Sequence, residues 1–176
     1  MRSLFVVALG MFLMANTIAA AKDSVSLSPQ NTKIEWIGTK PGGRHTGGFG
    51  EFSGTIDVAN SKLTVEIVTN SLHSDNNQLT DHLKGPDFFN VKKYTKATFN
   101  ATKIEAKASG GSTHLITGDL TLLGKKKTIS FPAKISTEGG LTLESKFTID
   151  RTHYGMTYGP GRVDNKVTIM VSVNAK

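Results

Sequence analysis

Apolar and polar residues alternate with a period of two along most of the chain from Lys33 onward. Successive side chains of a β-strand point to opposite faces of the sheet, so this alternation gives each strand one apolar and one wet face. Leu63, Val65 and Ile67, for example, share one face. The pattern predicts an all-β fold of eight antiparallel strands, as a barrel or a sandwich. The eight segments are residues 33–38, 50–58, 62–72, 97–101, 114–124, 127–136, 141–149 and 166–173.

Glycine and proline residues mark where these strands turn or break. Residues 108–112, 124–127 and 137–140 predict tight turns between neighbouring antiparallel strands. Pro132 lies inside a strand pattern and has no amide hydrogen for a ladder, so we expect an edge or a bulge there. Ile104 leaves the alternation that precedes it, which predicts a shift of register.

One stretch, TDHLKGPDFFNVKKYTKATF, interrupts the strand pattern. Leu79 and Leu83 share one face of a helix, which predicts a single short helix over about residues 79–85. Asp75 or Thr80 is expected to cap its start, and the Gly-Pro pair that follows is expected to end it. The expected architecture is therefore all-β with one helical insertion.

Two adjacent phenylalanines, Phe88 and Phe89, follow this helix. We expect them to lead back into a strand, where neighbouring side chains point to opposite faces. One ring is then expected in the core and the other beneath the helix.

The first residues have the layout of a secretory signal peptide. Arg2 precedes the apolar run Leu4–Met14, and small residues of the A-x-A type end at Ala21. We expect a signal peptide over residues 1–21, cleaved near Ala21, and one domain over residues 22–176 that is periplasmic or secreted. The alternative is an uncleaved membrane anchor, for which the apolar run is barely long enough.

Charge and cysteine content narrow the function. The chain has no cysteine, which excludes disulfides, a thiol nucleophile and a thiolate metal site. A formal net charge of +7 favours acidic partners, but the basic residues are dispersed and their tightest run, Lys125–Lys127, lies at a predicted turn. Stacking platforms for nucleic acid need aromatics beside basic residues, whereas here the aromatics fall on core-like positions. We expect no nucleic-acid partner. The core-like aromatics are Phe49, Phe52, Phe99, Phe131 and Phe147.

No residue pattern points to a metal or a cofactor. The five histidines lack the spacing of metal ligands, so we expect no metal site. The Gly-rich segment over residues 38–54 lacks the Gly-Lys-Ser/Thr of a phosphate loop and is expected to be a hairpin loop.

Catalytic signatures are also missing. The sequence GEFSG differs from G-x-S-x-G, because its serine is followed at once by glycine. Asp81 and His82 would diverge by about 100° on a helix, so they do not form a dyad by proximity. We therefore expect a protein that is not an enzyme.

The interior of the barrel is the remaining candidate site. A closed barrel of about eight strands either fills its lumen with side chains or holds one small ligand. Periodicity does not distinguish a packed lumen from a lipid pocket, so both interpretations stay open.

At this point the chain resembles the YceI-like family of bacterial proteins. The resemblance rests on the stretch that contains the predicted helix and on three further stretches in the same order. These are GGFGEFSGTI (47–56), GDLTLLGKKKTISFPAKI (118–135) and FTIDRTHYGM (147–156). It implies a lipocalin-like, eight-stranded antiparallel barrel, usually periplasmic, around an apolar tunnel that in some members binds polyisoprenoid chains such as quinone tails. Two Gly-rich segments depart from the family pattern, and we expect them to widen the pocket or loosen its mouth.

The resemblance implies an exported lipid-binding protein with an isoprenoid or similar apolar chain, or a quinone, in its lumen. We expect an apolar lipid as the partner, as a monomer or homodimer, with transient contact to a membrane surface as an option. Candidate ligand-binding residues are Phe52, Ile56, Val65, Ile67, Phe88, Phe89, Phe99, Leu120, Leu122 and Phe147. Candidate headgroup residues at the mouth are Arg44, His45, Tyr154, Tyr158 and Arg162.

Two alternatives remain at this stage. One is an exported structural or stress-related barrel with a packed lumen. The other is an enzyme on a lipid-like substrate, with His82, Asp81 or His153 as general base, which requires titratable groups to converge inside the lumen.

Overall fold

The computed structural model describes residues 24–175. The predicted signal peptide and its cleavage site lie outside the described residues. Eleven strands, one α-helix and two 3₁₀ helices make up the described chain. The strands are β1 (Val25–Leu27), β2 (Thr32–Lys40), β3 (Gly43–Phe49), β4 (Phe52–Asp57), β5 (Lys62–Val68), β6 (Leu72–Ser74), β7 (Lys96–Ser109), β8 (Ser112–Leu122), β9 (Lys125–Ser136), β10 (Leu141–Asp150) and β11 (Lys166–Ala175). The helices are η1 (Thr69–Ser71), α1 (Asn77–Lys84) and η2 (Arg151–Tyr154).

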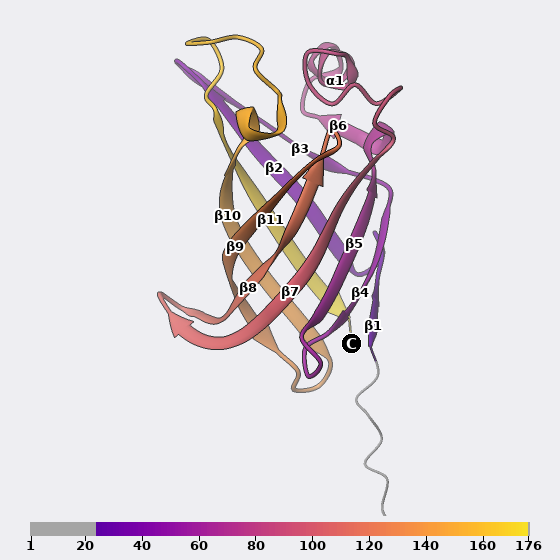
Figure 1. Ribbon diagram of the computed structural model, residues 1–176, viewed down its shortest axis with the longest axis vertical. Coiled ribbons are helices and arrows are strands. Elements are labelled where there is room, and N and C mark those ends of the chain that lie inside the picture. The colour runs from indigo at the N-terminus through magenta and orange to yellow at the C-terminus, as the bar shows by residue number, and fades with distance from the viewer. Residues whose placement is uncertain (1–23, 176) are drawn as a thin grey trace, which may run out of the picture.

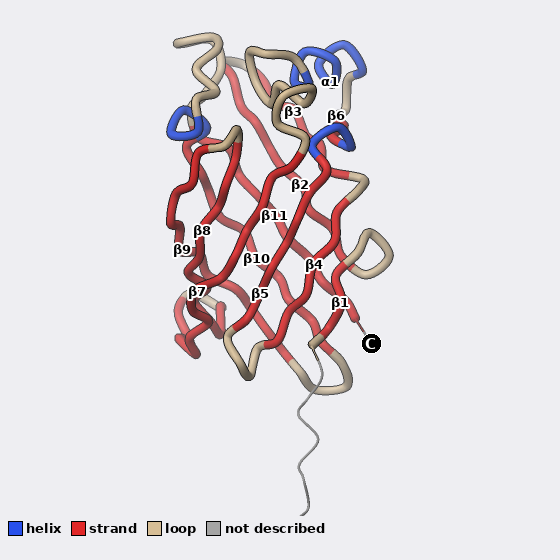
Figure 2. The backbone as a smooth tube through the Cα atoms, turned by 45° about the vertical axis from the view of Figure 1, so that its right-hand side comes forward, coloured by secondary structure: helices blue, strands red, loops and turns tan. Residues whose placement is uncertain are grey.

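The strands form one curled antiparallel sheet, so the all-β, lipocalin-like prediction is confirmed (Figures 1 and 2). Its order is β1-β4-β5-β7-β8-β9-β10-β11-β2-β3-β6. The eight predicted segments correspond to β2, β4, β5 and β7 to β11. The other three strands carry too little side-chain pattern to be found. β1 and β6 have three residues each, and β3 is the Gly-rich segment that was wrongly expected to be a loop.

Two predicted irregularities are present in the sheet. The pairing of β7 with β8 shifts between Ala101 and Lys103, just before Ile104. β9 pairs with β10 only over residues 134–136, so residues 125–133, which include Pro132, form a free edge on that side. Pro132 still pairs with β8 on its other side.

A core of strand side chains fills the lower end of the barrel. The β4–β5 and β9–β10 turns and the end of β11 meet there. Period-two alternation places apolar residues from many strands into one core, where Ile56 and Ile116 have exposed fractions of 1% and 0%. The lower core also includes Leu27, Leu63, Ile104, Ile135, Leu141, Leu143 and Val173.

The upper end is covered by α1 and the loops around it (Figures 1 and 2). The predicted helix is present, but it begins at Asn77 and its cap is Asn76, whose side chain accepts from the Leu79 amide at 2.9 Å. Gly85 ends the helix as predicted. Residues 85–95 then form turns rather than the expected strand. No helix within residues 24–175 is long and apolar enough to cross a membrane.

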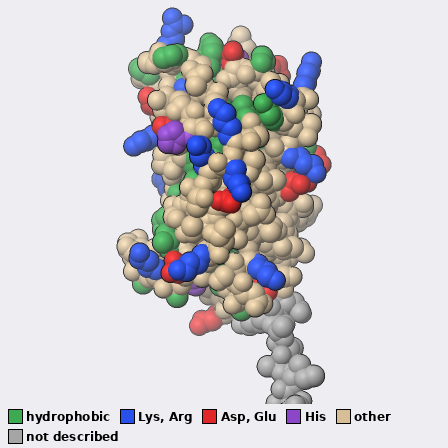
Figure 3. Space-filling view, in the orientation of Figure 1, with side chains coloured by type: hydrophobic (Ala, Val, Ile, Leu, Met, Phe, Trp, Pro, Cys, Tyr) green, Lys and Arg blue, Asp and Glu red, His purple; other side chains and the backbone are tan. Residues whose placement is uncertain are grey.

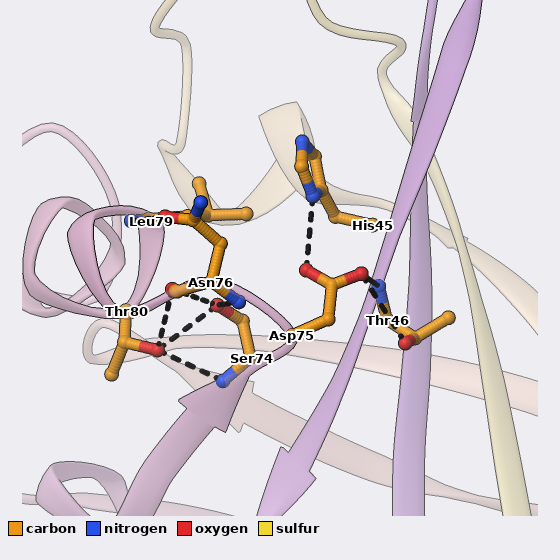
Figure 4. Close-up of polar contacts among 7 residues, drawn as sticks. All are labelled: His45, Thr46, Ser74, Asp75, Asn76, Leu79 and Thr80. Atoms are coloured by element: carbon orange, nitrogen blue, oxygen red, sulfur yellow. Dashed lines mark hydrogen bonds and ion pairs between the residues drawn. The ribbon is translucent and has the colours of Figure 1, made fainter.

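Asp75 does not cap α1 because its carboxylate is directed at β3 (Figure 4). It accepts a hydrogen bond from the Thr46 amide at 3.0 Å and lies 3.0 Å from Nδ1 of His45. These contacts hold the pKa of Asp75 below its usual value, with the Thr46 amide as the main cause. Thr80 instead accepts from the Ser74 amide at 2.9 Å. The start of the helix is thereby tied to the barrel wall.

Candidate functional site: an apolar lumen with a covered mouth

A cavity of about 210 Å³ occupies the lumen of the barrel. Its lining is almost entirely apolar and comes from strands on all sides, from α1 and from the loops above. A single water molecule needs only about 10–15 Å³ of such space, so the lumen is hollow rather than packed. All ten residues predicted to bind the ligand line it, while their role in ligand binding stays a prediction. They are Phe52, Ile56, Val65, Ile67, Phe88, Phe89, Phe99, Leu120, Leu122 and Phe147.

Two glycines in the wall make room for aromatic rings that face the lumen. Gly47 pairs with Trp36, and a Cβ on Gly47 would lie 2.3 Å from Cζ2 of that indole ring. A Cβ on Gly118 would lie 2.6 Å from Cζ of Phe99. Both separations are far below van der Waals contact, so only glycine lets these rings lie against the wall. Within the Gly-rich segment, Gly47 therefore makes room for the Trp36 ring.

Trp36 is a lining residue that sequence reasoning did not select. It alternates with Ile34 along β2, which was the available signal, and both line the cavity. The indole has an exposed fraction of 8%, and its Nε1 has no hydrogen-bond partner among the described residues. Because Trp36 is the single tryptophan of the chain, its fluorescence reports on the lumen.

The upper end of the cavity is roofed by α1 and residues 155–165, which we call the upper cover. The His82 ring joins the two parts: its centroid lies 4.8 Å from that of Tyr158 and 5.2 Å from that of Phe88. Leu83 from the helix side and Val163 from the loop side both line the cavity and are only half-buried. The lining is therefore more exposed under the upper cover than at the lower end.

Arg151 holds the loop half of the upper cover in place. Its guanidinium is buried and donates hydrogen bonds to four backbone carbonyls. Burial lowers the pKa of Arg151 from its ordinary value. No residue pattern predicted this role for Arg151, because its partners are backbone atoms of an irregular loop. The acceptors are the carbonyls of Asp164 (3.0 Å), Tyr158 (2.9 Å), Val163 (3.0 Å) and Met156.

The five predicted mouth residues do not form one group. Arg44 and Arg162 are exposed, and His45 is half-buried beside Asp75. Tyr158 is 41% exposed on the upper cover. Tyr154 is placed differently from the expectation, since it is 2% exposed and buried in the cluster below the cover.

The burial of Tyr154 follows from the 3₁₀ turn that carries it. η2 directs its ring inward, where it packs in one cluster with Phe88, Leu122 and Met156. Burial also raises the pKa of the Tyr154 phenol. A side chain in this position supports the roof of the lumen rather than a headgroup at the surface.

The enzyme alternative required titratable groups inside the lumen. Asp81, His82 and His153 do not line the cavity. Asp81 and His153 are exposed, and His82 pairs with Asp87 at 3.0 Å on the outer side of the cover. Among residues 24–175, no group of acidic and histidine side chains is arranged to hold a metal ion.

The outer surface offers no concentrated basic region on the face shown in Figure 3. Lysine and arginine side chains are scattered singly over the barrel, with acidic side chains among them. Lys96 lies 2.7 Å from Glu66, and Lys126 lies 3.4 Å from Asp119. The charge pattern is that of a solvated surface.

Solved structures show the same fold. BcnA of Burkholderia cenocepacia aligns with a TM-score of 0.73 and 25% identity, over 82% of this chain and 96% of that chain. The YCEI protein of Campylobacter jejuni aligns with a TM-score of 0.58 and 28% identity, over 74% and 84% of the two chains. A polyisoprenoid-binding domain from Saccharophagus degradans, implicated in plant cell wall breakdown, shares the fold with a TM-score of 0.65 and 15% identity, over 87% and 98%.

Sequence comparison identifies the family. A UPF0312 protein of Pseudomonas putida (strain W619) is 30% identical over 174 residues, which cover 92% of this chain and 89% of that relative. One of Pseudomonas aeruginosa (strain LESB58) is 34% identical over 139 residues, covering 72% and 71%. The model of the YceI-like domain matches residues 20–175. With its curled antiparallel sheet and apolar lumen, this chain belongs to the YceI-like family.

Proposed function

We propose that this protein is an exported carrier that holds an isoprenoid or similar apolar lipid chain, including the tail of a quinone, in its lumen. The observation that carries the proposal is the continuous apolar lining of a hollow cavity of about 210 Å³. An apolar chain gains roughly 25 cal/mol for each Å² removed from water, so a lined cavity binds it without specific polar contacts. The fold shared with a polyisoprenoid-binding domain supports the same ligand class.

Export and membrane contact complete the proposal. The signal-peptide pattern of residues 1–21 supports a periplasmic or secreted location. An apolar ligand resides in membranes, so a carrier has to approach a membrane surface transiently to load or unload. The placement of the candidate bases outside the lumen supports a binding protein rather than an enzyme.

Native mass spectrometry of the mature protein, purified without detergent, tests the proposal. We expect a stoichiometric adduct of isoprenoid mass, identified in an organic-solvent extract, and the same spectrum gives the monomer or dimer state. If the protein is isolated empty, polyprenols and isoprenoid quinones are added back. Failure of all of them to bind would contradict the carrier function.

Substitutions separate lumen binding from surface binding. Phe99→Asp and Phe147→Asp place a charge in the lumen and should abolish uptake, because a charge is costly in an apolar site. Their matched controls are Thr98→Asp and Thr148→Asp, the adjacent outward-facing positions on the same strands. Circular dichroism confirms that each variant is folded. Full binding by the folded lumen variants would show that the ligand sits elsewhere.

A further inference from the structure

Apart from the free edges of the sheet at β1 and β6, the barrel wall has one long stretch where neighbouring strands lack backbone pairing. β10 pairs with β11 over ten residue pairs and β8 with β9 over nine, whereas β9 pairs with β10 over only three. We call residues 125–132 of β9 and 145–150 of β10 the β9–β10 seam. In Figure 1 the upper part of β9 runs toward the centre of the view while β10 continues to the upper left, so the strands diverge upward.

The seam has a defined lower and upper boundary. At the bottom, Pro132 has no amide hydrogen, and its carbonyl accepts from Oγ of Ser145 at 2.6 Å rather than from a strand amide. At the top, η2 follows directly on β10, and Tyr154 packs into the cluster with Leu122 from the end of β8. We call the stretch between these limits the window: β9 and β10 form no ladder pairs here, and apolar side chains lie across it.

Four apolar side chains fill this window, two from each strand. Phe131 and Phe147 stack across it with ring centroids 4.2 Å apart and an interplanar angle of 10°. Ile129 and Ile149 lie one inward position higher on the same two strands. All four line the cavity, so the window leads directly into the lumen.

The geometry points to the β9–β10 seam as a lateral access through which the apolar chain enters and leaves the lumen. This inference rests on the proposed function. Parting any fully paired neighbouring strands breaks a ladder of backbone hydrogen bonds and exposes their polar groups to an apolar chain. Opening the seam separates only side chains. The lost contacts between the Phe131 and Phe147 rings are replaced by contacts of these rings with the ligand. The upper cover is less suited to opening, because Arg151 and Asp75 fix its two halves.

Cross-linking across the seam tests this route. Because the chain has no native cysteine, only the introduced cysteines react. Counting upward from the Lys134–Glu144 pair places Ser130 level with Thr148, and both are exposed. Ser130→Cys/Thr148→Cys is joined with a short bifunctional thiol reagent. The matched control is Thr55→Cys/Thr64→Cys, across the paired β4–β5 strands, where the native hydroxyl oxygens lie 3.1 Å apart. A third pair, His82→Cys/Tyr158→Cys, locks the upper cover.

Stopped-flow quenching of Trp36 by a geranylgeranyl-tailed naphthoquinone measures uptake, with the same variants before cross-linking as references. We expect the seam lock to slow uptake and release about tenfold or more while the equilibrium affinity stays nearly unchanged, because both directions use the blocked route. The β4–β5 lock should change neither rate.

Two results overturn the inference. The lateral route is contradicted if cross-linking the seam leaves the uptake and release rates unchanged, or if only the cross-link on the upper cover slows them. Either result leaves the carrier function intact. Absence of quenching in the uncross-linked wild-type protein, together with no adduct in native mass spectrometry, contradicts the carrier function and the lateral route with it.

Discussion

The two ends of the barrel are closed by different means. At the lower end, residues from many strands interdigitate, and Ile56 and Ile116 are almost completely buried. At the upper end, α1 and residues 155–165 lie over the cavity, and the contacts are hydrogen bonds and ring edges with half-exposed side chains such as Leu83. The lower end is part of the folding core, whereas the upper cover is attached to it.

This difference separates stability from access. Regions with few buried apolar contacts open at lower free energy than the core, and binding sites are commonly drawn from them. The lower core can therefore keep the barrel intact while the upper half opens locally. Four predictions test this division, beginning with the substitution that should cost most.

Ile116→Ala in the lower core should lower the free energy of unfolding by about 2–5 kcal/mol, because it removes buried methyl groups and leaves a void. Leu83→Ala in the half-buried α1 should cost clearly less. Urea denaturation followed by circular dichroism measures both. Equal costs would mean that the upper cover is as much a part of the core as the lower end.

Arg151→Met should lower the stability by about 1.5–3 kcal/mol, since carbonyls of the loop lose a charged donor. Hydrogen exchange should speed up locally in residues 155–165 and remain slow in β10. The control is Arg162→Met, which is exposed and should change neither quantity. If exchange rises throughout the barrel instead, the loop is not an independent cover.

Gly47→Ala tests the wall between the two ends. The new Cβ would lie 2.1 Å from the His73 carbonyl oxygen and against the Trp36 ring, so we expect a loss of about 1–3 kcal/mol and a shift in tryptophan emission. Gly43→Ala meets only the flexible end of Lys40 at 3.3 Å and should be nearly silent. An unaltered Trp36 spectrum in folded Gly47→Ala would show that the wall yields instead of the ring.

The smallest effect on stability should come from lowering the pH so that Asp75 is protonated. The pKa of Asp75 is held below 3.8, so its contacts with Thr46 and His45 contribute stability above that value and lose it as the pH falls through the lower folded-state pKa. NMR chemical shifts of residues 75–84 should then move before those of the lower core. Asp75→Asn should show the acid form of these shifts at neutral pH. Simultaneous movement of both regions would remove the distinction between the two ends.

Much of the barrel could be predicted from the sequence because strand alternation is a local pattern. It located eight strands and placed eight of the ten candidate residues on the lumen side, including Phe99 and Phe147. Strand alternation did not identify β3, because its glycines have no side chains to form an apolar–polar pattern and only backbone pairing defines the strand. The start of α1 was misplaced because Asp75 binds β3 across 29 residues of chain, which a local capping rule does not include.

The upper cover was the least predictable region for a related reason. Tyr154 was expected at the mouth as one of its polar groups, but a 3₁₀ turn directs it inward. Arg151 is fixed by backbone carbonyls of a loop whose path no residue pattern encodes. Irregular segments take their conformation from tertiary contacts, so their side-chain directions follow only from the folded molecule.

Gly47 and Gly118, against which the rings of Trp36 and Phe99 pack, have an evolutionary consequence. The lack of a Cβ at Gly47 and Gly118 determines how far the rings of Trp36 and Phe99 extend into the lumen. The width of the lumen therefore depends on these two wall positions as well as on the residues that line it. A lineage that replaced one of these glycines would narrow its lumen without altering any residue that lines it. Differences in lumen width among YceI-like proteins should then be sought at these two wall positions first.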